Sequence, residues 1–79
     1  MLKEEDKTAA FKALQALAVK GRTYASEEAP YEKIIDLMDR LEYLAALAWR
    51  TDDAGDRFRR YLKETAEKHQ CWNAIEPFE

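Results

Sequence analysis

The chain has 79 residues and a formal net charge of −3, and hydrophobic residues make up 47% of it. That length corresponds to one domain, so we expect residues 1–79 to form a single helical domain. A single cysteine excludes an internal disulfide, and one cysteine with one histidine cannot supply the four ligands of a structural zinc site. We therefore predict no metal and no cofactor.

The composition also bears on where the chain acts. A lone cysteine and a charged stretch over residues 1–7, with no targeting signal, are typical of a cytoplasmic protein. The longest uncharged apolar run, residues 43–49, is far shorter than a membrane span. We therefore expect no membrane contact. Two glycines and two prolines leave little room for loops, so we expect most of the chain to be helical.

The first predicted helix begins near Asp6, and its end has two interpretations. Gly21 follows a basic last turn and has the form of a C-terminal stop. However, Gly21, Tyr24 and Ala25 continue the apolar face in phase, which a stop would not require. The helix therefore either ends at Gly21 or continues to about Glu28.

The central helix is predicted over residues 31–50, directly after Pro30, whose fixed φ suits a first helical turn. Its apolar residues cover an arc of roughly 180°, whereas one neighbouring helix needs a stripe of about 100°. The arc consists of Tyr31, Ile34, Ile35, Leu37, Met38, Leu41, Leu44, Ala45, Ala48 and Trp49. Its width predicts at least two neighbours for this helix.

The third helix is predicted over residues 53–73, after a connection at residues 51–53 in which an aspartate can cap it. Pro77 prevents the tail from continuing as helix, so Ile75 and Phe78 are expected to fold back onto the helices. The predicted fold is all-α, a small three-helix antiparallel bundle. The alternative is a long helical hairpin plus a third helix that dimerises, which follows if the first helix passes through Gly21.

His69 and Cys71 both have side chains that can bind metals or react. On one continuous helix they point about 200° apart, so they cannot share a ligand. Projection places His69 on the apolar face, where we expect a partly buried ring bonded to a neighbour. The same projection places Cys71 on the polar side as an ordinary thiol.

The central helix also provides the predicted site for a protein partner. Acidic residues recur there at spacings of three and four, which costs a few tenths of a kcal/mol per like-charge pair. Two apolar residues, Tyr43 and Leu47, follow them on the polar side of the helix. This pair forms either a contact surface for another protein or the contact with a third neighbouring segment of the same chain. The predicted contact residues are Glu32, Asp36, Asp39, Tyr43 and Leu47. The competing interpretation is a solvated helix face.

The third helix carries the only basic stretch, formed by Arg57, Arg59, Arg60 and Lys63. Such residues contact phosphates in nucleic-acid-binding proteins. Acidic residues are interleaved with them and the whole domain is acidic, so the alternative of a small nucleic-acid-binding regulator is the weaker one.

No nucleophile with a neighbouring base is visible, because Ser26 is the only serine and His69 the only histidine. The predicted function is therefore that of a non-enzymatic small interaction protein, an adaptor, regulator or inhibitor of the kind found among phage and plasmid accessory proteins. It would bind a protein partner of basic character through a helix surface, and we expect a homodimer.

Overall fold

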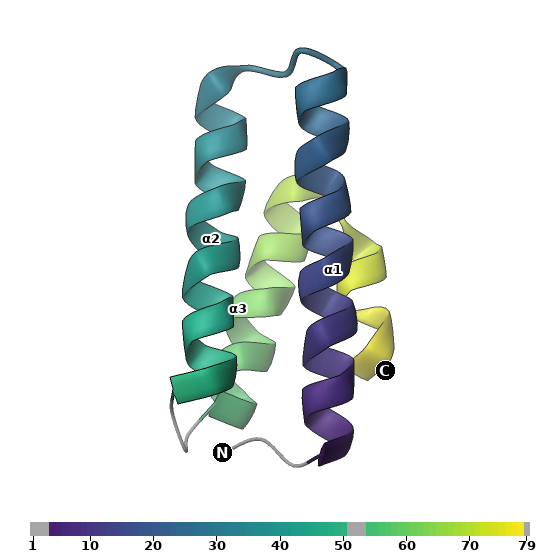
Figure 1. Ribbon diagram of the computed structural model, residues 1–79, viewed down its shortest axis with the longest axis vertical. Coiled ribbons are helices and arrows are strands. Elements are labelled where there is room, and N and C mark those ends of the chain that lie inside the picture. The colour runs from purple at the N-terminus through teal and green to yellow at the C-terminus, as the bar shows by residue number, and fades with distance from the viewer. Residues whose placement is uncertain (1–3, 51–53, 79) are drawn as a thin grey trace.

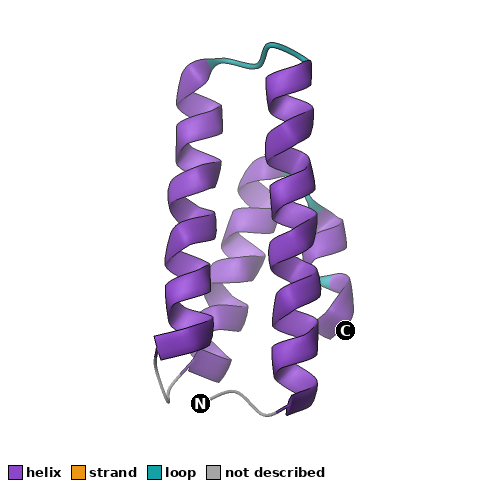
Figure 2. Ribbon diagram, viewed as in Figure 1, coloured by secondary structure: helices purple, strands orange, loops and turns teal. Residues whose placement is uncertain are grey.

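The computed structural model describes residues 4–50 and 54–78 (Figure 1). Three main helices are followed by two short 3₁₀ turns. They are α1 (Glu4–Ser26), α2 (Tyr31–Arg50), α3 (Ala54–His69), η1 (Trp72–Ala74) and η2 (Glu76–Phe78). No strand occurs in these described ranges (Figure 2), so the prediction of an all-α protein is confirmed.

The first helix does not stop at Gly21. This glycine has no positive φ, and a Cβ added to it would lie 3.8 Å from Cδ2 of Leu37, an ordinary packing distance. The helix ends at Ser26, and Glu28 then adopts a φ of 54° while the Ala29 amide donates to the Tyr24 carbonyl over 2.9 Å. This is a Schellman motif formed without glycine. Of the two predicted ends, continuation is confirmed.

α2 has the predicted bounds. Its first amides at Lys33 and Ile34 donate to the Pro30 carbonyl, over 2.9 and 3.4 Å. α1 and α2 run side by side in opposite directions, joined at one end by a short loop, and α3 lies behind them (Figure 1). The predicted connection at 51–53 and its capping aspartate lie outside the described residues.

The third helix is shorter than predicted and ends at His69 rather than Asn73. Gln70 adopts a φ of 53°, and the Cys71 amide donates to the Ala66 carbonyl over 2.9 Å. This second Schellman motif again uses a residue other than glycine, which is why it could not be recognised from the residue types alone.

The tail folds back as predicted. Ile75 and Phe78 pack against the core, and the rings of Phe58 and Phe78 have centroids 5.7 Å apart. Both 3₁₀ turns contact α1, so the tail covers the part of α1 that α3 leaves uncovered. The largest fully buried side chains are Phe58, Leu17, Leu37, Leu44, Leu62 and Thr65.

Candidate interaction surface

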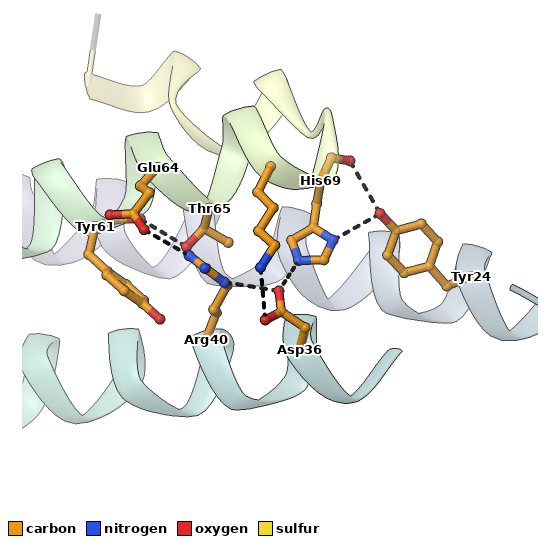
Figure 3. Close-up of polar contacts among 8 residues, drawn as sticks. Tyr24, Asp36, Arg40, Tyr61, Glu64, Thr65 and His69 are labelled. Atoms are coloured by element: carbon orange, nitrogen blue, oxygen red, sulfur yellow. Dashed lines mark hydrogen bonds and ion pairs between the residues drawn. The ribbon is translucent and has the colours of Figure 1, made fainter. Parts of the chain in front are cut away.

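A polar cluster joins α2 to α3, and Asp36 is its centre (Figure 3). One Asp36 oxygen accepts from Nε2 of His69 at 2.7 Å and from Nε of Arg40 at 2.9 Å. Its other oxygen pairs with Nζ of Lys68 at 3.2 Å. Arg40 extends the cluster to Glu64 at 3.5 Å. Asp36 is therefore bound within its own chain.

The His69 ring is only 4% exposed, and both of its nitrogens have partners. A carboxylate only accepts, so Nε2 carries a proton and donates to Asp36. In the neutral ring, Nδ1 accepts from the Tyr24 hydroxyl, whose oxygen lies 3.0 Å away. That oxygen is also 3.4 Å from the His69 carbonyl, so the hydroxyl has an acceptor even if both ring nitrogens are protonated. The prediction of a buried, bonded histidine is confirmed.

Two titrating groups of this cluster have displaced pKa values. The hydrogen bond from His69 lowers the pKa of Asp36 below its ordinary value, and Lys68 and Arg40 act in the same direction against partial burial. Burial raises the pKa of the Tyr24 hydroxyl, and nearby Cys71, Glu27 and Asp36 add to that rise. Both shifts favour the protonation states that the hydrogen bonds require at neutral pH.

The five residues predicted to bind a partner occupy different environments. Glu32 and Asp39 are exposed, while Asp36 is engaged by α3 as described above. Tyr43 packs edge-to-face on Tyr61 of α3, with ring centroids 4.8 Å apart. Leu47 is 5% exposed and belongs to the core. The structure does not bring these residues together as one open surface, and α3 is the third neighbour that the sequence left as an alternative.

The basic stretch of α3 divides between two sides of the helix. Arg57 and Arg60 line a hollow with Tyr43, whereas Arg59 and Lys63 line another with the tail. Arg59 also pairs with Asp6 at 3.1 Å, and its guanidinium carbon lies 5.5 Å from the centre of the Phe78 ring. These four residues therefore line two hollows rather than one.

The prediction that Cys71 lies on a polar side is wrong. The helix has already ended at His69, and the turn at Gln70 brings Cys71 back against α1. Its sulfur lies 3.8 Å from the Ala16 carbonyl, and burial raises the pKa of the thiol. Cys71 is therefore a packed side chain with a weakened tendency to form the reactive thiolate.

An apolar groove lies on another side of the molecule, between α1 and α2. It has a volume of about 380 Å³, and all but one of its lining residues are apolar. It is lined by Leu17, Ala18, Gly21, Arg22, Ala25, Ile34, Leu37, Met38 and Leu41. α3 and both 3₁₀ turns lie behind the two helices, so no other described element covers this groove (Figure 1).

Large apolar side chains extend the groove along both helices. On α1, Phe11 lies seven and fourteen residues before Ala18 and Ala25, and seven residues are close to two full turns. On α2, Tyr31 has the same relation to Met38 and Ala45, and Trp49 follows one turn later. We call this surface the open face, and it consists of Phe11, Ala18, Ala25, Tyr31, Met38, Ala45 and Trp49 around the groove.

The exposure of the open face is high for residues of this kind. Met38 is 55% exposed and Trp49 is 59% exposed, and Phe11 and Tyr31 are exposed to a similar or greater degree. Scattered exposed apolar residues are ordinary, but contiguous ones are typical of interaction surfaces, so the open face is the candidate contact surface. The signal was present in the sequence as the wide apolar arc of the central helix, of which α1 covers only one part.

The two helices carry opposite charge beside the open face. α1 has four basic residues, all from Lys7 onward, and three acidic ones in its first turn, whereas α2 has four acidic and three basic residues. Arg22 lies one turn after Ala18, and Glu42 lies one turn after Met38, with Asp39 next to it on the outer side. Within the described part of the chain, none of these three side chains forms an ion pair.

Residues 4–50 and 54–78 contain no group of three or more side chains placed to hold a metal ion. In the same ranges, no helix combines the length and the apolar character that a membrane crossing needs. Comparisons with protein-family models, with curated proteins and with solved structures found no significant match.

Proposed function

We propose that this chain is a non-enzymatic interaction protein, an adaptor, regulator or inhibitor, that binds a protein partner through the open face of α1 and α2. The folded unit in this proposal is a small antiparallel three-helix bundle. The observation that carries the proposal is the uncovered apolar groove with Met38 and Trp49 beside it. Aromatic residues and methionine are enriched at protein interfaces, where they supply much of the buried area.

The chemistry beside the groove supports a protein partner rather than a small molecule. Only Arg22 among the groove residues carries a charge, so little is available to orient a polar ligand. The exposed carboxylates Asp39 and Glu42 lie along the outer side of α2. Such an arrangement, an apolar centre with a charged rim, fits an apolar helix surface flanked by basic residues.

The proposal differs from the sequence-based site in which side of α2 it uses. Tyr43 and Leu47 pack toward α3, and Asp36 is held there by His69. Glu32 and Asp39 stay exposed; Asp39 lies beside Glu42 on the outer side of α2, whereas Glu32 lines a hollow with Lys68 and His69 of α3. Nucleic-acid binding, the alternative from sequence, has less support because the basic residues of α3 divide between two sides.

The test is affinity capture with the tagged chain from an extract of its source cells. Met38→Glu places a charge in the middle of the open face without changing a buried residue. Trp72→Glu is the control, because it places the same charge on a residue that is 52% exposed and lies outside the open face. We expect the wild-type chain and Trp72→Glu to retain the same protein and Met38→Glu to lose it. Equal recovery by all three chains, with unchanged helicity by circular dichroism, would contradict the proposal.

A further inference from the structure

We infer that the protein covering the open face is a second copy of this chain, with α1 of each copy lying beside α2 of the other. The inference rests on the proposed function, because it names the partner of the same surface. Three features support it: the charges of the two helices, the level at which matching residues lie, and the length of the face.

The charges make the face complementary to itself. The α1 side is basic through Lys7, Lys12 and Arg22, and the α2 side is acidic through Asp39 and Glu42. A surface with one basic and one acidic edge fits an identical surface turned so that unlike edges meet. The basic partner that the acidic residues of α2 require is then α1 of the second copy.

Only one of two symmetric arrangements meets that condition. A two-fold axis parallel to the helices places α1 of each copy beside α2 of the other. A two-fold axis across the helices instead places α1 beside α1 and α2 beside α2, so that like charges meet. The charges therefore select the first arrangement, in which every helix of the four has antiparallel neighbours, as in a four-helix bundle.

The levels of individual residues agree with this arrangement. Gly21 of α1 lies against Leu37 of α2, so these two residues have the same height along the bundle axis. Because the helices are antiparallel, each step forward on α1 is a step back on α2. Arg22 therefore has the height of residue 36, and Phe11 has that of residue 47. A parallel two-fold axis keeps these levels, which places Arg22 about 4.5 Å along the axis from Asp39 of the second copy. Phe11 is likewise about 3 Å in level from Trp49 of the second copy, so two large exposed aromatic residues cover each other.

The face also runs along most of the molecule. The two longer principal extents are 37 and 20 Å, and Figure 1 looks onto the side that they span, with α1 and α2 toward the viewer. α1 and α2 have 23 and 20 residues, which is about 30 Å of helix or more for each, so a second pair of helices can lie along them over their whole length.

The experiment combines molar-mass measurement with charge reversal. Sedimentation equilibrium of the wild-type chain should give twice the monomer mass of 9.2 kDa. Arg22→Glu and Asp39→Arg should each raise the dissociation constant about tenfold, because each places like charges together twice in the symmetric dimer. Lys63→Glu and Glu67→Arg, on exposed positions of α3, are the matched controls and should leave it unchanged.

The decisive sample is an equal mixture of Arg22→Glu and Asp39→Arg chains. In the inferred dimer both contacts of the mixed pair join unlike charges, so the mixture should associate at least as tightly as the wild type. A monomeric wild-type chain at every concentration, or a mixture as weak as its components, would overturn the inference. If the wild type is monomeric while Met38→Glu still loses a different captured protein, the inference fails and the proposed function stands.

Discussion

The side of α2 that faces α3 and the side that forms part of the open face differ in how their chemistry is satisfied. Toward α3, the carboxylate of Asp36 has three cationic or donor partners, and Leu47 is buried. Toward the open face, Met38 and Trp49 project from the same helix and are more than half exposed. One helix thus has a side whose interactions are complete and a side whose apolar surface is uncovered.

This difference separates what holds the monomer together from what is available to a partner. Removing a buried, hydrogen-bonded group is costly because its partner would remain buried without a hydrogen bond to water or to another protein group. Exposed apolar side chains contribute little to the stability of the monomer but much to association, because their surface is removed from water only when a partner binds. Substitutions on the side that faces α3 should therefore lower the free energy of unfolding, whereas substitutions on the open face should weaken association and change the stability of the monomer little.

The largest expected effect comes from Leu47. We expect Leu47→Ala to lower the free energy of unfolding by about 2–5 kcal/mol, because it deletes buried methyl groups and leaves a cavity. Met38→Ala, on the other side of α2, should change it by about 0.5 kcal/mol or less in dilute solution. Urea unfolding followed by circular dichroism measures both. Similar small effects for the two variants would place Leu47 on the surface, as the sequence-based partner site assumed.

An intermediate effect should appear as a pH dependence at Asp36. Because the folded-state pKa is below the ordinary value of 3.8, the folded protein binds fewer protons than the unfolded chain in this range. The stability from Asp36 is complete above 3.8 and is lost as the pH falls through the lower folded-state pKa. Asp36→Asn should therefore be less stable than the wild type at neutral pH and lose less stability on acidification.

The matched control for that pH series is Glu67→Gln. Glu67 is exposed on α3, away from the open face, and forms no ion pair within the described residues. Its variant should follow the wild-type stability curve throughout, as measured by urea midpoints at each pH. An acid slope in Asp36→Asn as steep as that of the wild type would show that the His69 and Lys68 contacts do not carry the linkage.

The smallest effect is expected at the pair between Arg59 and Asp6, which joins α3 to α1. The Arg59 side chain is more than half exposed, and solvent screens such pairs. Asp6→Asn should reduce the free energy of unfolding by about 0.5 kcal/mol or less, and added salt should remove the difference. A loss comparable to that in Leu47→Ala would mean that the pair is far better shielded than its exposure indicates.

Much of the fold could be predicted because it follows from periodicity. The bounds of α2 and the burial of His69 were visible as apolar spacing, and the return of Phe78 to the core followed from Pro77. The end of α1 was left open between Gly21 and about Glu28 and the end of α3 was missed, because Glu28 and Gln70 adopt the positive φ at which glycine is the expected residue. The wrong placement of Cys71 followed from that missed end. Cys71 lies two residues beyond the last residue of α3, where a helical projection no longer gives the direction of a side chain.

The candidate surface was foreseen in part. The wide arc of α2 indicated a neighbour beyond α1, and Met38 and Trp49 were within it. Sequence could not decide which side α3 would occupy, because Tyr43 and Leu47 looked like exceptions on a polar side. In fact Tyr43 packs on Tyr61, and the charged residues beside it are satisfied across the α2–α3 contact. Long-range pairing of this kind depends on the tertiary arrangement rather than on local spacing.

The most direct test of the open face uses the two tryptophans as reporters. Trp49 lies on the open face, whereas Trp72 lines a hollow with Ala16 and Val19 of α1, outside the groove; they are 59% and 52% exposed in the single chain. Trp72→Phe leaves Trp49 as the only reporter, and Trp49→Phe leaves Trp72. Acrylamide quenching over a concentration series should show Trp49 becoming shielded as the chain associates while Trp72 stays accessible. Quenching of Trp49 that does not change with concentration, or shielding of Trp72 instead, would contradict the assignment of the open face as the contact surface.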